Sequence, residues 1–211
     1  MRCKLWSGEF FELAICYGLV LLVIWTSNPV QRFLFWIAFA WILATTLVYR
    51  PDANTLGLRF SDLLGSLCIT GGGLLFAGLL IGIAREVHTL HPLYGAEPLG
   101  LHMAGYLLWA FGQQFILQDY FLLRLLRILP NQSVAIITTA VLFSAAHLPS
   151  LVLTVASLAW GIVVCTLFLR YRNLYALGLV HGILGLCVAI SVPDAVTHHM
   201  TVGLGYLQYH H

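Results

Sequence analysis

Charged residues are what this sequence has least of. Asp, Glu, Lys and Arg make up 9% of the 211 residues, whereas hydrophobic residues make up 60%. An ordinary soluble domain is about a quarter charged, so this chain could not cover a surface that faces water. The composition excludes a soluble globular protein and predicts an integral membrane protein in contact with the lipid bilayer. The formal net charge of +2 gives no basis for a nucleic-acid partner, and we expect none.

A disulfide framework is also lacking. The five cysteines are odd in number and scattered, and four lie in apolar segments, which indicates small core residues rather than disulfides or zinc ligands. Gly71, Gly72 and Gly73 are followed by no lysine, which excludes a phosphate-binding loop; glycines in such a setting let helices approach closely. We predict no cofactor and assign no metal ligand. Two metal sites stay open. One is a weak interfacial site in the polar tail, at His198, His199, His210 and His211, and the other is formed by His147 and His181 with a carboxylate inside the membrane.

Apolar runs long enough to cross a membrane recur along the chain. A spanning helix needs about 20 apolar residues, and the runs cover residues 10–27, 31–49, 65–84, 101–127, 132–148, 151–169 and 174–191. The fourth run is overlong, and the fifth is short and ends before Pro149. We predict an all-α, polytopic membrane helix bundle of about seven transmembrane helices. No internal repeat or linker is visible, so we expect a single membrane domain over residues 1–211.

Basic residues lie mostly on one side of these runs. The N-terminal side carries Arg2, Lys4, Arg50, Arg59, Arg124, Arg127, Arg170 and Arg172, and the other side Arg32 and Arg85. The positive-inside rule therefore predicts a cytoplasmic N-terminus and, with seven spans, an external C-terminus. We expect a multi-pass protein of the bacterial inner membrane.

Two segments between or before the runs are ambiguous. The charged start of the chain resembles a signal peptide, but Glu9 and Glu12 interrupt it and no small-residue cleavage site follows, which favours a retained signal anchor. Residues 51–66 mix leucines with charged residues. This pattern fits an interfacial amphipathic helix and a plain cytoplasmic loop equally well.

Polar side chains stand inside several apolar runs. They are Gln113, Gln114, Gln118, Asp119, His147 and His181. A polar group in lipid costs several kcal/mol unless it is paired, so such residues are usually functional or packed against one another. On an α-helix Gln114 and Gln118 share a face, whereas Asp119 lies about 120° from Gln113.

No glutamate accompanies these residues. Hydrolysis of a peptide bond needs a group that accepts a proton from water, and the amide of glutamine cannot do so. Among the acidic residues only Asp119 is embedded in an apolar run, and it could replace the missing base only if the helix were distorted. The favoured alternative is that Asp119 pairs with an arginine or a helix end. His147 could likewise cap a helix, and His181 could be a packed polar residue between glycines.

Three stretches carry a family resemblance. They are Gln113-Gln114-Phe-Ile-Leu-Gln118-Asp119, then Phe143-Ser-Ala-Ala-His147-Leu-Pro, and the approach from Asn173 to His181 and Gly185. In this order they resemble the motifs of the CAAX-protease and bacteriocin-processing family, also called the Abi or type II CAAX prenyl endopeptidase family. Its motifs are Glu-Glu-x-x-x-Arg, Phe-x-x-x-His, and His followed four residues later by Asn. The second stretch matches closely, and the other two are degenerate.

The resemblance implies roles for individual residues. It places His147 and His181 at the family's catalytic histidines, which activate water together with a glutamate. Gln113 and Gln114 take the positions of the glutamate pair, and Gly185 takes the position of an asparagine that helps to bind the oxyanion. Gln118 stands at the motif arginine, and Gln118 and Asp119 are auxiliary candidates. The resemblance covers about residues 65–191.

The departures from the motifs fall on the chemistry. Losing a general base costs about 10²–10⁴ in rate, and losing an oxyanion donor about 10²–10³. The first hypothesis is therefore a membrane-embedded endopeptidase with a degenerate motif, which cleaves a peptide or protein substrate near or within the membrane, with or without a lipidated tail. The second is an inactive pseudoprotease that binds such a segment. The third is a small transporter or structural subunit, for which no inverted repeat is visible.

Overall fold

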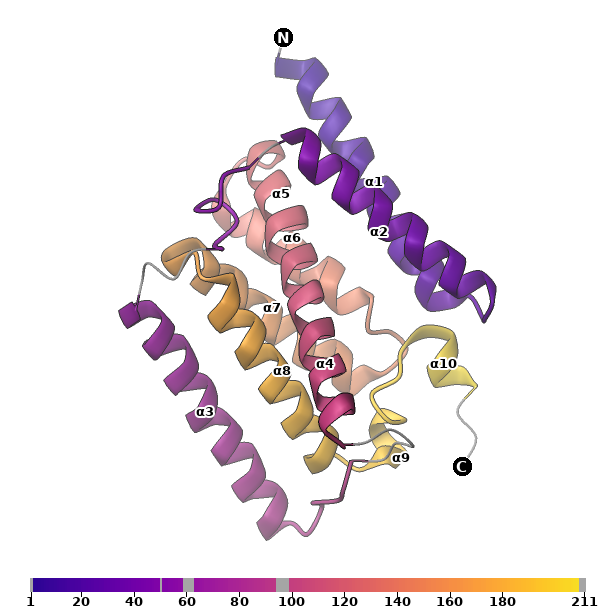
Figure 1. The fold of residues 1–211 in the computed structure, drawn as a ribbon, viewed down its shortest axis with the longest axis vertical. Coiled ribbons are helices and arrows are strands. Elements are labelled where there is room, and N and C mark those ends of the chain that lie inside the picture. Colours follow the sequence, from indigo (N-terminus) through magenta and orange to yellow (C-terminus); the bar gives the residue numbers. More distant parts are fainter. Residues whose placement is uncertain (1, 50, 59–62, 94–98, 209–211) are drawn as a thin grey trace. The chain divides into compact units, whose positions relative to one another are not determined.

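The chain is almost entirely helical. The computed structural model describes residues 2–49, 51–58, 63–93 and 99–208, so His210 and His211 lie outside the described residues. The long helices are α1 (Arg2–Trp25), α2 (Val30–Tyr49), α3 (Leu63–Glu86), α4 (Leu99–Gln114), α6 (Gln132–Ala145), α7 (Leu151–Tyr171) and α8 (Leu174–Ser191) (Figure 1). The shorter ones are the π-helix η1 (Phe115–Leu122), α5 (Leu123–Ile128), α9 (Asp194–Thr197) and α10 (Gly203–Leu207). The predicted all-α class is confirmed.

Five of the helices are long and apolar enough to cross a membrane. In the described part of the chain the candidate spans are Gly8–Trp25, Val30–Tyr49, Leu64–Glu86, Leu151–Tyr171 and Leu174–Ser191. The predicted run 101–127 is instead divided among α4, η1 and α5, and the predicted run 132–148 is a 14-residue helix. A polytopic helix bundle is confirmed, with five spans that meet the length criterion by themselves.

The helix ends follow from local chemistry. The side chain of Asn131 accepts a hydrogen bond from the amide of Val134 at the start of α6, and that of Asn173 accepts one from Ala176 at the start of α8. Each asparagine satisfies a backbone N–H that has no partner within its helix. Of the ambiguous segment 51–66, residues 53–57 form turns and residues 63–66 belong to α3. The choice between an interfacial helix and a loop stays a prediction, because residues 59–62 lie outside the described residues.

The chain divides into two compact units, which are described separately. Unit 1 comprises Met1–Asp52, Ile116–Cys165 and Thr201–His211, and unit 2 comprises Ala53–Phe115 and Thr166–Met200. In unit 1, α1 packs against α2 and contacts α5 and α10. In unit 2, α8 packs against both α3 and α4. The expectation of a single domain stays a prediction.

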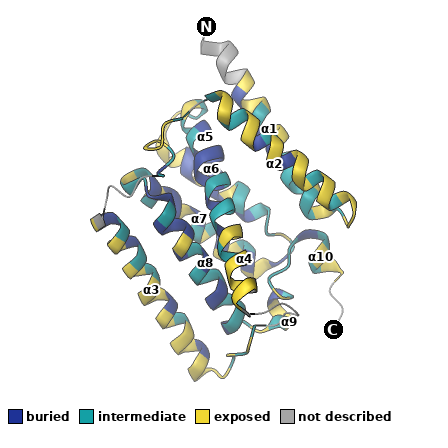
Figure 2. Ribbon diagram, in the orientation of Figure 1, coloured by how far each residue is buried: buried dark blue, intermediate teal, exposed yellow. Residues whose placement is uncertain are grey.

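Many residues of the long helices α2 and α3 are exposed (Figure 2), and large apolar side chains are among them. Phe33 and Trp36 on α2 are 67% and 64% exposed, and Leu75 on α3 is 79% exposed. Side chains of this kind are favourable against lipid and costly against water. Together with the apolar spans, these exposed side chains identify an integral membrane protein.

Candidate functional site

A glutamine–histidine pair joins α4 to α8 in unit 2. Nε2 of Gln114, the last residue of α4, lies 2.6 Å from Nδ1 of His181 in the first half of α8. Gln114 is fully buried and His181 is half-buried. The structure thus brings together two of the residues that the sequence singled out, one from the first polar stretch and one from the third.

The chemistry of this contact fixes the state of the imidazole. An amide nitrogen only donates hydrogen bonds, so Nδ1 of His181 accepts and the ring proton of the neutral imidazole sits on Nε2. A glutamate in place of Gln114 would accept a hydrogen bond from Nδ1–H instead. With the amide of Gln114 beside Nδ1, His181 donates hydrogen bonds through Nε2–H. With a carboxylate there, the proton would sit on Nδ1 and Nε2 would accept.

Glycines of α8 let α4 come close enough for this pair. A Cβ added at Gly178 would lie 2.7 Å from the ring of Phe111, and one added at Gly182 would overlap Leu107. Small residues at a helix contact allow such an approach inside a membrane. Gly185 continues the same face of α8, and there a Cβ would overlap the side chain of Tyr106.

The other members of the first polar stretch have different surroundings. Gln113 is half-buried and makes no side-chain hydrogen bond with any residue that the structure describes. In unit 1, Nε2 of Gln118 donates to the carbonyl oxygen of Val164 at 3.4 Å. Asp119 is 4% exposed. Of the two glutamines at the family's glutamate positions, Gln114 is the one that contacts a predicted site histidine.

The helix changes type immediately after Gln114. Residues Phe115–Leu122 form a π-helix, whose hydrogen bonds link residues five apart rather than four. The expectation that Gln114 and Gln118 share a helical face assumed α geometry throughout, and that assumption is wrong beyond Gln114. The helix is therefore distorted between Gln114 and Asp119, and the role of Asp119 in place of a missing base stays a prediction. Such π segments often mark functional sites.

His147 lies in the turn after α6, in unit 1. The predicted run 132–148 would place it inside a helix, but α6 ends at Ala145 and residues 146–149 form turns. Nδ1 of His147 lies 2.7 Å from the carbonyl oxygen of Phe143, and the two rings contact edge to face at 4.8 Å. Because a carbonyl only accepts, Nδ1 carries the proton and Nε2 keeps its lone pair. Nε2 of His147 can therefore accept a proton, as a general base does.

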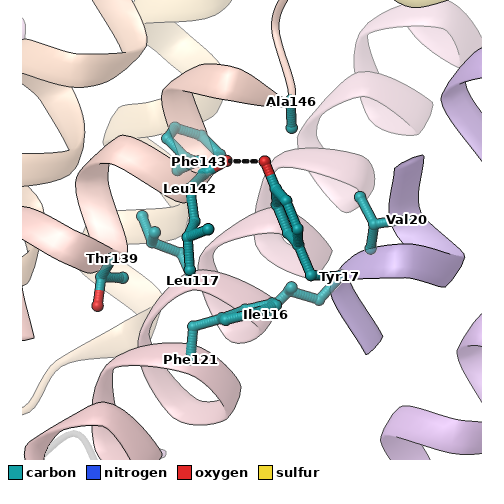
Figure 3. Close-up of a pocket in the computed structure, with 9 residues that line it drawn as sticks. All are labelled: Tyr17, Val20, Ile116, Leu117, Phe121, Thr139, Leu142, Phe143 and Ala146. Carbon is teal, nitrogen blue, oxygen red and sulfur yellow. Dashed lines mark hydrogen bonds between the residues drawn. The ribbon is translucent and has the colours of Figure 1, made fainter. Parts of the chain in front are cut away.

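A small apolar cavity of about 50 Å³ lies in unit 1 beside this turn (Figure 3). Its two polar lining groups are already bonded, because Tyr17 donates to the carbonyl oxygen of Leu142 at 3.1 Å and Thr139 donates to that of Ala135 at 2.7 Å. A cavity lined in this way stays dry, so it suits a small apolar group rather than a hydrolytic water. The lining residues are Tyr17, Val20, Ile116, Leu117, Phe121, Thr139, Leu142, Phe143 and Ala146.

Unit 1 also holds a cluster of charges that sequence reasoning missed. Nε of Arg127 lies 2.9 Å from Oε1 of Glu9, and Nε of Arg124 lies 3.6 Å from Oε2 of Glu12. The guanidinium of Arg124 also stacks on the ring of Tyr120 at 3.8 Å. We call these four charged residues the charge cluster. The signal in the sequence was the matched spacing, since both acids and both arginines are three residues apart and so share helical faces.

A second polar group in unit 2 involves histidines outside the predicted site. Asp194 lies 3.0 Å from Nδ1 of His199 and 3.8 Å from Nδ1 of His91, and Nε2 of His91 lies 3.0 Å from the carbonyl oxygen of Val192. Among the described residues no group of three or more His, Cys, Asp and Glu side chains is arranged to hold a metal ion.

One comparison identifies the class of protein. Residues 95–187 match the family model of type II CAAX prenyl endopeptidase Rce1-like proteins, within the core of about residues 65–191 that the motifs predicted. No curated protein and no solved structure matches the chain. The predicted resemblance to this family is confirmed over residues 95–187. Because it is a family of membrane proteases, the match supports membrane protease activity on peptide or protein substrates.

Proposed function

We propose that this chain, whose residues 95–187 match the family model of type II CAAX prenyl endopeptidase Rce1-like proteins, cleaves a peptide bond at the membrane. His147 and His181 take opposite roles in this proposal, and they are paired because both stand at histidine positions of the family motifs. The observation that carries this proposal is the contact between Gln114 and His181 at 2.6 Å. It makes His181 a donor, whereas the contact with Phe143 makes His147 an acceptor. Hydrolysis requires one group of each kind.

His147 acts as the base in this proposal. As the oxygen of water adds to the carbonyl carbon, one water proton moves to Nε2 of His147 and the π electron pair of the carbonyl moves to its oxygen. When the C–N bond breaks, that pair returns and the leaving nitrogen takes the proton from His147. The carbonyl of Phe143 holds the imidazole in the required tautomer through Nδ1.

His181 acts on the carbonyl side. Its Nε2–H donates a hydrogen bond to the carbonyl oxygen, whose charge grows as water attacks, and Gln114 maintains the tautomer that makes this possible. Such a donor contributes most when it is held in place before the reaction. A neutral amide–imidazole pair also avoids placing an unpaired carboxylate inside the bundle.

A second candidate is a pseudoprotease that binds a membrane segment without cutting it. The observation that favours it is the same amide, because Gln114 cannot accept a proton from water as a glutamate would. On this account His147 and His181 are retained contacts for a bound peptide. The family match favours either account over a transporter.

Cleavage of a defined peptide tests the proposal. The full chain in liposomes would be mixed with a prenylated peptide ending in a CAAX sequence, and the products identified by mass spectrometry. We expect the wild type to cleave, and His147→Ala and His181→Ala each to lower the rate about 10²–10⁴-fold. His88→Asn is the control, because His88 is exposed, lies at φ 57° and contacts neither pair; asparagine tolerates that conformation.

Gln114→Glu separates the two candidates. If the wild type is inactive and this variant gains cleavage, the lost base explains the inactivity and the pseudoprotease is correct. Wild-type cleavage that survives His147→Ala would overturn the role of His147. The same peptide without its prenyl group tests whether a lipidated tail is part of the substrate.

The proposed orientation places the N-terminus in the cytoplasm of a bacterial cell. It is supported by the excess of arginines on the N-terminal side of the spans. On this orientation Arg127 lies on the cytoplasmic side of the membrane. Labelling of a single cysteine placed at Arg127 by a membrane-impermeant reagent in intact cells would contradict it.

A further inference from the structure

The side chain of Tyr106 occupies an unusual position between α4 and α8. A Cβ added at Gly185 would overlap the Tyr106 hydroxyl oxygen and would lie 2.8 Å from its ring carbons. The phenol therefore takes the volume that any side chain at position 185 would fill. Only glycine at this position of α8 admits the tyrosine, so the two residues form one structural feature.

The Tyr106 hydroxyl is a donor without a partner. It makes no hydrogen bond with any other residue that the structure describes, and the side chain is half-buried in the helix contact. The hydroxyl is not among the fully buried polar atoms of the described residues that lack a partner, so it keeps some accessible surface. An accessible donor of this kind is available to a bound molecule.

This donor lies close to His181 along α8. Gly185 follows His181 by four residues, which is one helical turn, or about 6 Å along the axis, on the same face. Both residues contact α4, His181 through Gln114 and Gly185 through Tyr106. The contact between α8 and α4 thus includes the imidazole of His181, from α8, and the phenol of Tyr106, from α4.

We propose that the Tyr106 hydroxyl donates a hydrogen bond to the substrate carbonyl oxygen and so is a catalytic residue beside His181. The inference rests on the proposed function. As water adds to the carbonyl carbon and the π pair moves to the oxygen, the phenol donates a hydrogen bond without transferring its proton. The pair returns to re-form the carbonyl when the C–N bond breaks. Gly185 has no side chain that could donate this hydrogen bond, so in this proposal the donor comes from Tyr106 on α4.

Kinetics of the full chain with the prenylated CAAX peptide test the proposal. Tyr106→Phe removes only the hydroxyl and is expected to lower kcat about 10²–10³-fold, the loss seen for one such donor, with KM changed less than about threefold and the melting temperature unchanged. Tyr171→Phe is the matched control, because its hydroxyl makes no hydrogen bond with a described residue and lies at the end of α7. A structural tyrosine would instead lower the melting temperature and leave kcat unchanged.

A compensating variant strengthens the test. Tyr106→Leu frees the space beside Gly185 that the phenol fills, and adding Gly185→Asn places an amide donor there from α8. We expect kcat of this double variant to be at least tenfold higher than kcat of Tyr106→Leu alone. Gly185→Asn alone should abolish activity, because the asparagine side chain would overlap Tyr106. Equal rates for Tyr106→Phe and the wild type would overturn the proposal while leaving the proposed function intact.

Binding separates this inference from the proposed function. Two uncleavable versions of the peptide would be compared, one with a secondary alcohol and one with a methylene at the scissile carbonyl. Tyr106→Phe should weaken binding of the alcohol about tenfold, as for one hydrogen bond, and leave the methylene peptide unaffected. If the chain cleaves no peptide but shows this difference in binding, Tyr106 is a hydrogen-bond donor to the bound peptide and the proposed protease function is wrong. Equal binding of both peptides by wild type and variant would refute the donor.

Discussion

Both units carry polar side chains inside apolar helices, but they pair them in different ways. Unit 1 keeps full charges, with Glu9 and Glu12 of α1 facing Arg127 and Arg124 of α5. Unit 2 joins α4 to α8 through the neutral side chains of Gln114 and His181 and through glycines that admit bulky neighbours. The charge cluster is a contact between oppositely charged groups, whereas the neutral pair is a contact between a donor and an acceptor.

The difference indicates what each pair is for. Removing one partner of a buried ion pair leaves a costly unpaired charge, so the charge cluster ties its helices together. A hydrogen bond between membrane helices contributes only about 0.6 kcal/mol on average, so the neutral pair contributes little to stability. Its more important property is that it fixes the tautomer of His181. We therefore expect variants of the charge cluster to affect folding and variants of the neutral pair to affect chemistry.

The largest loss of stability is expected for Arg124→Ala. The side chain is 3% exposed, pairs with Glu12 and stacks on Tyr120. Its removal should lower the free energy of unfolding by about 3 kcal/mol. This is the low end for a broken buried pair, because the carboxylate of Glu12 is 26% exposed. Thermal unfolding in detergent measures the change. Arg170→Ala is the control, with an expected change within about 0.5 kcal/mol. Equal losses in the two variants would contradict a structural role for the charge cluster.

The next largest effect is expected for Gly73→Ala in α3. A Cβ at this position would overlap the side chain of Val180 on α8, and such overpacking costs about 1–3 kcal/mol. Gly72→Ala is a closely matched control, because a Cβ there meets nothing within 4 Å and alanine favours the helix by up to about 1 kcal/mol. The two variants should therefore move the unfolding temperature in opposite directions. If both lower it, close packing through glycine does not stabilise unit 2.

The bounds of α2, α3, α7 and α8 could be predicted from the sequence to within two residues, and the reason is the bilayer. Its thickness sets the length of an apolar run, so α2, predicted as 31–49, covers Val30–Tyr49, and α8 begins and ends as predicted. The π-helix after Gln114 could not be predicted, because it depends on backbone hydrogen bonding that no residue pattern encodes. The shortness of α6 was visible in Pro149, but its end at Ala145 was not.

The candidate site was predicted residue by residue but not as pairs. Gln114 and His181 were chosen because each is polar in an apolar run, and only packing of α4 on α8 shows that they touch. Tyr106 was missed because a tyrosine in a membrane helix is ordinary, and its importance depends on the glycine opposite. The charge cluster was missed because Glu9 and Glu12 were taken only as interruptions of a signal-like segment.

A smaller effect is expected when the neutral pair is tested for stability. A double-mutant cycle with Gln114→Leu, His181→Leu and the double variant should give a coupling energy of about 0.6 kcal/mol. Unfolding in detergent measures it in the same way as for Arg124. A coupling as large as the loss in Arg124→Ala would show that the neutral pair is a structural tie, and the contrast between the two units would fail.

The smallest effect is expected at Asp194, where unit 2 does carry a carboxylate. It lies near two histidines, and His199 is 40% exposed, so solvent screens the pairs and each contributes about 0.3 kcal/mol. Asp194→Asn should therefore lower the free energy of unfolding in detergent by roughly 0.6 kcal/mol or less. Glu86→Gln, at the exposed end of α3, is the control, with no measurable change expected. A loss as large as that of Arg124→Ala would show that Asp194 stabilises unit 2 as the charge cluster stabilises unit 1, and the contrast between the two units would fail.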